Sequence, residues 1–182
     1  MEGHTRLITD IKFMPDNVGF ISSSVDKTLR LTNAGNGQSR KLVTLPYELK
    51  SIDISPDGKR LAGVSVNGKV LMVDLVTNTY NEVWTDENVV RSADSTKSVK
   101  VANRILSVAW HPQRNMIALG VEVINDKRNV VRGTVKLLDL STNRVKELSG
   151  HKAGISDLKF SPDGLLLASA GLDSKLQMWV ID

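Results

Sequence analysis

The chain has 182 residues, of which 24 are Lys or Arg and 20 are Asp or Glu, and it contains no cysteine. This length and a hydrophobic content of 41% are enough for a buried core, and the lack of cysteine excludes disulfides, a thiol nucleophile and thiolate metal sites. The net charge of +4 is small and scattered, which disfavours nucleic acid as a partner. No leader sequence or membrane-length apolar segment is recognisable, so we expect a cytoplasmic protein that binds no membrane.

One pattern recurs four times, an alternating apolar and polar run that ends at a proline turn. It covers residues 11–16, 52–58, 108–113 and 158–164, and the four prolines are 41, 56 and 50 residues apart. Each copy indicates a strand that ends in a tight turn, because proline fixes φ and aspartate or glycine suits the turn positions that follow. The chain is therefore predicted to consist of repeats.

Each repeat continues with further predicted strands. Second strands are expected at 20–24, 61–64, 116–120 and 165–169, third strands at 28–31, 69–73, 134–138 and 175–179, and fourth strands at 41–44, 80–84 and 145–148. No segment combines helical periodicity with capping residues, so we expect almost no helix. Four antiparallel strands repeating at roughly 40–45 residues predict an all-β fold, a β-propeller segment of four blades. The prediction amounts to 15 strands, with the last blade lacking its fourth strand.

The last repeat resembles a complete WD repeat. Gly150-His151 lies 11 residues before its turn proline, and Ser169, Asp173 and Trp179 follow. The first repeat has His4, Ser22 and Asp26 at the same offsets, with Thr32 in the tryptophan position, whereas the middle repeats have Leu45 and Val101 in place of the histidine. We expect one domain of four units, at approximately 1–44, 45–100, 101–149 and 150–182, and the resemblance covers nearly all of it apart from residues 77–100 and 125–132.

A serine, a histidine and an aspartate also suggest a hydrolase triad, but the resemblance implies a structural role. In WD repeats the indole N–H of Trp179 would donate to Ser169, the Ser169 hydroxyl to His151, and the other imidazole nitrogen to Asp173. No Gly-x-Ser-x-Gly sequence surrounds Ser169, as a nucleophile elbow would require. The same network without its tryptophan is expected for His4, Ser22 and Asp26. We therefore expect no catalytic residue, no metal site and no cofactor.

Several single residues carry their own expectations. Phe13, Trp110, Phe160 and Trp179 are expected in the core. His111 stands where a small residue usually precedes the turn proline, so a solvated or backbone-bonded ring is expected there.

Two insertions lengthen the middle repeats. Residues 77–100 are polar and include Asp86-Glu87, which we interpret as a solvated loop, either a long mobile connection or a binding loop. Residues 125–129 lengthen a hairpin that could offer Lys127, Arg128 and Arg132 to an acidic partner.

The resemblance implies a non-catalytic scaffold for protein–protein interaction, with other proteins or peptide segments as partners. The loops before the first strands would lie on one face, and Arg6, Tyr47 and Arg104 are candidate contacts there because Arg and Tyr are enriched at interface hot spots. The alternative is the regulatory or sensor part of a larger signalling enzyme, an NTPase or protease. An arc of four blades would leave apolar faces exposed, so we expect missing blades or self-association to complete the ring.

Overall fold

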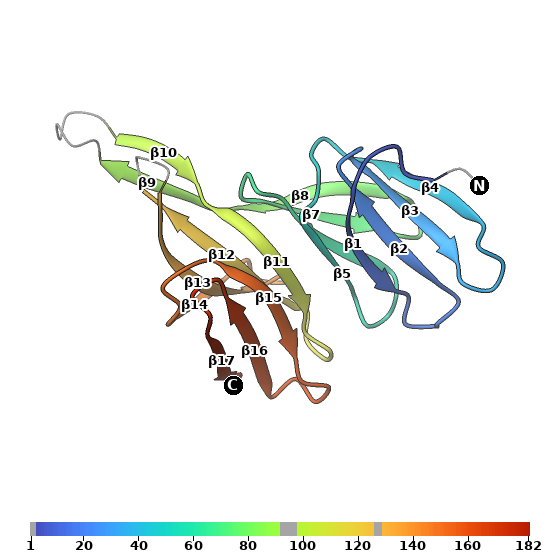
Figure 1. Cartoon of the computed structure of the whole chain (residues 1–182). Coiled ribbons are helices and arrows are strands. Elements are labelled where there is room, and N and C mark those ends of the chain that lie inside the picture. Colours follow the sequence, from blue (N-terminus) through green and yellow to red (C-terminus); the bar gives the residue numbers. More distant parts are fainter. Residues whose placement is uncertain (1–2, 92–97, 126–128) are drawn as a thin grey trace.

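The computed structural model describes residues 3–91, 98–125 and 129–182. These residues form 17 β-strands and no helix (Figure 1). Fifteen of the strands build four antiparallel sheets in the arrangement of a four-blade β-propeller, which confirms the predicted fold class. The sheets are blade 1, with β1 (Ile8–Phe13), β2 (Gly19–Ser24), β3 (Thr28–Asn33) and β4 (Ser39–Thr44); blade 2, with β5 (Ser51–Ile54), β6 (Arg60–Val64), β7 (Lys69–Asp74) and β8 (Thr79–Thr85); blade 3, with β11 (Arg104–Trp110), β12 (Met116–Ile124), β13 (Val130–Asp139) and β14 (Val145–Ser149); and blade 4, with β15 (Ile155–Phe160), β16 (Leu166–Gly171) and β17 (Leu176–Val180).

The proline turns join the first and second strands of the blades. In blade 2 the Ser55 hydroxyl donates to Asp57 at 2.6 Å and accepts the backbone N–H of Arg60 at 2.9 Å. Gly58 closes this turn with a φ of +70°, a left-handed conformation that glycine adopts without steric cost. The residues that marked the repeat in the sequence are thus the residues that reverse the chain.

Two further strands were not predicted. The strands β9 (Glu87–Arg91) and β10 (Ser98–Ala102) pair antiparallel, with Val90 opposite Val99 and Val89 opposite Lys100. They form a separate two-stranded sheet that extends away from the blades in Figure 1. Residues 77–100 were interpreted as a solvated loop, either a long mobile connection or a binding loop, and these two strands correct that interpretation. The 15 strands that were counted for the four blades are all present. Short strands on either side of a polar segment gave too little periodicity to be recognised.

Asp86, which was predicted to lie in a solvated loop, is buried. It is 2% exposed and follows β8, where its backbone N–H donates to the carbonyl of Gly68 at 2.8 Å. The ammonium group of Lys136 on β13 donates to its carboxylate at 2.7 Å and also lies 3.1 Å from Glu147. Burial of a charge is tolerated when a close opposite charge accompanies it. This ion pair therefore fastens the end of blade 2 to blade 3.

Three hydrophobic clusters form the core, and each lies between two successive blades. The first joins blades 1 and 2 through Ile21, Leu29, Ile52 and Leu61. The second joins blades 2 and 3, and the third joins blades 3 and 4. Among the described residues no core cluster joins blade 4 to blade 1. Figure 1 accordingly shows the blades as an arc, with blades 1 and 4 at its two ends.

The aromatic residues that were expected in the core follow this arrangement. Trp110 is 6% exposed, whereas Phe160 and Trp179 are half-buried against the cluster between blades 3 and 4. Phe13 is 65% exposed, so its predicted burial was wrong. The physical reason is its place on the side of blade 1 that no other blade covers.

Candidate functional site

A buried chain of hydrogen bonds crosses blade 4. The indole N–H of Trp179 donates to the hydroxyl of Ser169 at 2.9 Å, and that hydroxyl lies 2.8 Å from Nε2 of His151. Nδ1 of His151 lies 3.0 Å from the carboxylate of Asp173. Because Ser169 accepts from the indole, its own proton is directed to Nε2, and Nδ1–H then donates to Asp173. His151 is 3% exposed and Ser169 is 1% exposed.

Asp173 connects this network to the main chain. Its carboxylate accepts the backbone N–H of Lys152 at 2.8 Å and that of Lys175 at 3.2 Å. The hydrogen bond from Lys152, followed by the one from His151, lowers the pKa of Asp173 to about 2. An ionised Asp173 therefore ties the loop before β15 to the turn between β16 and β17.

A related network lies in blade 1. Nε2 of His4 lies 2.8 Å from the Ser22 hydroxyl, and Nδ1 lies 3.0 Å from the carboxylate of Asp26. Burial favours the neutral form of Asp26, but hydrogen bonds from Thr28, from the backbone and from His4 outweigh it and hold its pKa well below the usual range. Thr32 occupies the tryptophan position and donates to Ser39 at 3.2 Å. This network therefore ends at Ser22.

The middle blades have an aliphatic residue in place of the histidine. Leu45 is 4% exposed and belongs to the apolar cluster between blades 1 and 2. The side chain of Val101 lies outside the described residues.

Polar side chains that the sequence did not single out join the first strands of neighbouring blades. The carboxylate of Asp10 on β1 accepts the backbone N–H of Ile52 at 2.9 Å, and that of Asp53 on β5 accepts the backbone N–H of Trp110 at 2.6 Å. Burial raises the pKa of Asp53, although the bond from Trp110 acts in the opposite direction. The position of Asp10 holds Asp or Ser in all four repeats, which is a weak sequence signal, whereas the position of Asp53 holds Lys or Ala in the other three repeats and gives none.

His111 corresponds to the backbone-bonded ring among the two expected alternatives. It is 1% exposed, and its Nδ1 accepts the backbone N–H groups of Gln113 and Arg114 at 3.1 and 3.0 Å. The ring lies 4.9 Å from that of Phe160 in blade 4. Burial, and after it the charge of Arg114, lowers the pKa of His111. His111 thus bonds the backbone of the turn in blade 3, with other partners than Ser55 has in blade 2, and its ring also packs against blade 4.

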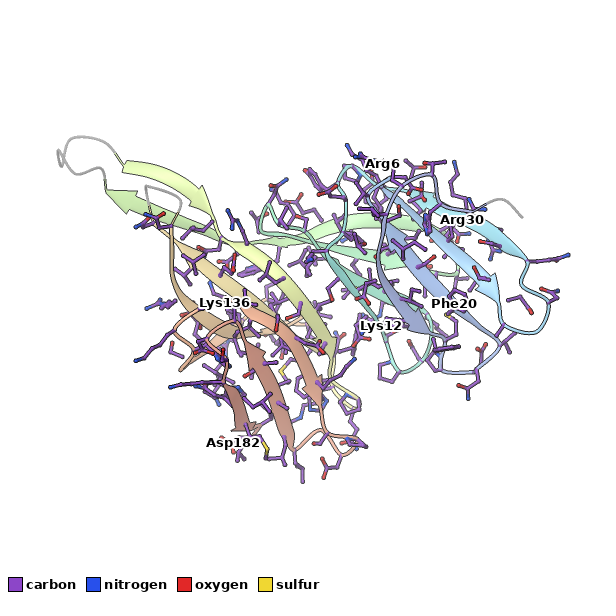
Figure 2. All side chains as sticks on the ribbon, viewed as in Figure 1. Arg6, Lys12, Phe20, Arg30, Lys136 and Asp182 are labelled. Atoms are coloured by element: carbon purple, nitrogen blue, oxygen red, sulfur yellow. The ribbon has the colours of Figure 1, made fainter. Side chains whose placement is uncertain are left out.

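The three candidate contact residues come from the end of the molecule at which the first strands begin. Arg6 is exposed beside the start of β1, as Figure 2 shows. Tyr47 is half-buried and packs on the cluster between blades 1 and 2. The Arg104 side chain is 44% exposed and its guanidinium lies 3.4 Å from the carboxylate of Glu122. Lys127 and Arg128 lie outside the described residues, and Arg132 is exposed.

A groove of about 610 Å³ lies at the opposite end of blade 1. Met14, Val18 and Leu31 contribute apolar surface, and Asp16 and Arg40 are among its polar lining residues. Within the described part of the chain, no three His, Asp or Glu residues are arranged to hold a metal ion. No helix that could cross a membrane occurs in that part either.

Comparison with known proteins agrees with this geometry. The family model described as WD domain, G-beta repeat, matches residues 1–33 and 142–180, which include both histidine networks. The chain is 24% identical to the pre-mRNA-processing factor 19 homolog 2 of Arabidopsis thaliana, 26% to the WD repeat-containing protein SL1-17 of Schistosoma mansoni, and 26% to the serine-threonine kinase receptor-associated protein of Gallus gallus. These alignments cover 98% of the chain but 31%, 52% and 44% of the respective relatives, so the chain spans about half of their length or less. The family model thus identifies the repeats that carry the two histidine networks as WD repeats, and the middle blades share their antiparallel strand order.

Proposed function

We propose that this chain is a non-catalytic scaffold that binds other proteins through the loops before its first strands. WD-repeat relatives fit the role of a protein-interaction scaffold in general. One relative, the serine-threonine kinase receptor-associated protein, is named for association with another protein. The proposal concerns the blades in this chain, and the partners of longer relatives are not transferred to it.

The observation that carries the proposal is that Ser169, His151 and Asp173 are all engaged in hydrogen bonds within blade 4. The Ser169 hydroxyl is held between the indole of Trp179 and the ring of His151, and it is 1% exposed. A nucleophilic serine needs an open side from which a substrate carbonyl can approach it. Since Ser169 has none, its bonds support a role in stabilising the blade.

The loops before the first strands, which we call the loop face, support the proposal because hydrogen bonds from the blades hold two of them in place. Asp173 and Asp26 accept backbone N–H groups of Lys152 and Thr5, which lie in the loops before β15 and β1. A loop held in one conformation loses less entropy when it binds a partner. The exposed Arg6 lies directly after Thr5. A fixed loop that presents an arginine is suited to a protein interface.

Affinity capture with quantitative mass spectrometry tests the proposal. The bait is the full chain, compared with an Arg6→Ala/Tyr47→Ala/Arg104→Ala variant and with a control in which Asn36, Lys59 and Gln113, exposed residues at the opposite ends of the blades, become alanine. We expect the first variant to lose its partners and the control to keep them. Tyr47 packs on the core, so the melting temperature of each variant is measured and Arg6→Ala is also tested alone. If the triple variant keeps every partner while it is folded, the loop face is not the binding surface.

A further inference from the structure

The two ends of the arc expose the two complementary halves of a blade–blade interface. We define the leading face of a blade as the side toward the preceding blade, and the trailing face as the side toward the following one. The leading face of blade 1 carries Ile8, Ile11 and Phe13, which are 54%, 48% and 65% exposed. The trailing face of blade 4 carries Leu176 and Met178, which are 81% and 69% exposed. Apolar residues gathered in this way mark an interaction surface.

The repeat shows what covers the leading face in other blades. Ile11 holds the same position in its blade as Ile52, Val108 and Leu158, which are 0%, 2% and 1% exposed. Each of those three residues belongs to a cluster shared with the preceding blade.

The position of Ile8 behaves in the same way. Its counterparts Leu49, Ile105 and Ile155 are 1%, 0% and 0% exposed. The leading face of blade 1 therefore has the composition that elsewhere in this chain is covered by a trailing face.

The trailing face shows the same difference. Leu176 corresponds to Leu29, Val70 and Val135, each of which is 0% exposed under the following blade. Met178 corresponds to Met72 and Leu137, which are 8% and 5% exposed.

A polar position agrees with the apolar ones. Asp157 of blade 4 corresponds to Asp10 of blade 1, and each carboxylate accepts the N–H of the next residue, at 2.9 and 2.8 Å. Asp10 uses its other oxygen to accept the N–H of Ile52 in the following blade. Asp157 offers the corresponding second oxygen to a leading face that is added to blade 4, although the N–H of Ile11, the counterpart of Ile52, already donates to Asp10.

We propose that the trailing face of blade 4 binds the leading face of blade 1 of a second copy of this chain, and that the contact is made twice. One chain offers one face of each kind, so a two-fold rotation satisfies both faces of both copies and closes a ring of eight blades. Eight blades lie within the range known for propellers. The contact continues three interfaces that the chain already makes, in the same register and with the same residue types. It goes beyond the proposed function and uses surfaces other than the loop face.

Size-exclusion chromatography with light scattering tests the proposal on the full chain. The expected mass is twice the chain mass of 20.0 kDa. Phe13→Asp alters the leading face and Leu176→Asp the trailing face. Every contact in the ring needs one face of each kind, so each variant alone is expected to be a monomer. Val76→Asp is the matched control, because Val76 is 71% exposed outside both faces and this variant should stay a dimer.

Mixing the two variants in equal amounts distinguishes the modes of association. A Phe13→Asp chain keeps its trailing face and a Leu176→Asp chain keeps its leading face, so the mixture is expected to form a heterodimer through one intact contact. The proposal is overturned by a monomeric wild-type chain, by a single variant that still dimerises, by a mixture that stays monomeric, or by assemblies larger than two chains. Thermal melting followed by circular dichroism verifies that both variants are folded. We expect them to fold because Phe13 and Leu176 are exposed in the single chain.

Discussion

Replacement of His151 by alanine removes the central member of the blade 4 network. The imidazole ring is buried and makes hydrogen bonds to Ser169 at 2.8 Å and to Asp173 at 3.0 Å. Two lost bonds cost about 1 kcal/mol each, and a buried group left without its partner adds about 1–3 kcal/mol. Asp173 keeps its bonds from two backbone N–H groups, which limits that second cost. We expect a loss of about 2–4 kcal/mol in the free energy of unfolding.

Urea unfolding and thermal melting measure this loss. For a chain of this size, each kcal/mol lowers the melting temperature by roughly 2–4 °C, so a decrease of about 5–15 °C is expected. Trp179→Phe removes the indole N–H, which donates to Ser169, together with part of the ring that packs against the cluster between blades 3 and 4, and should cost at least about 1 kcal/mol. His4→Ala tests the network that ends at Ser22, and we expect its effect to be smaller than that of His151→Ala. An unchanged melting temperature for His151→Ala would refute the structural role of the network.

Three further predictions concern pH and packing. The pKa of Asp173 is lowered to about 2, so its stabilising effect is present above the unfolded pKa near 4 and lost as the pH falls toward 2; Asp173→Asn should flatten the acid limb of a melting temperature–pH profile, and an unchanged limb would contradict this. The pKa of His111 is lowered in the folded state, so wild type should lose stability as the pH falls below about 6.5, while His111→Ser should not show that decline between neutral and mildly acidic pH. A β-carbon on Gly133 would overlap the backbone carbonyl of Ala153, so Gly133→Ala should destabilise the packing of blade 4 on blade 3 by about 1–3 kcal/mol. If the variant unfolds at the same urea concentration as the wild type, the close approach of Ala153 to Gly133 is refuted.

The blades could be predicted because each repeat contains turn residues and strand patterns that can be recognised locally. Pro56 and Asp57 form the turn that their sequence indicates. The strand before the turn, Ser51–Ile54, alternates polar and apolar residues with the period of two typical of a sheet, and the strand after it, Arg60–Val64, ends in a continuous buried run. Repetition then strengthened weak signals, since a run such as 145–148 became credible only at the corresponding place in its unit. Local chemistry and spacing were sufficient for this level of the structure.

The interactions between blades could not be predicted from local sequence. Lys136 stands in an alternating strand and gives no sign that Asp86, 50 residues earlier, will be its buried partner. The exposure of Phe13 likewise depends on which blade faces it and not on its own strand. The residues of the histidine networks could be selected because a family pattern places them, whereas the link from Asp10 to Ile52 depends on how two sheets are placed in space.

Site-specific photo-crosslinking in living cells tests most directly the claim that this chain binds proteins through its loop face. A photoreactive amino acid replaces Arg6 in one version of the chain and Lys59, which is exposed in the turn at the opposite end of blade 2, in the other. We expect a discrete crosslinked protein from position 6 and none from position 59. Crosslinks from position 59 alone, or equal crosslinking at both positions, would contradict the proposed interaction face.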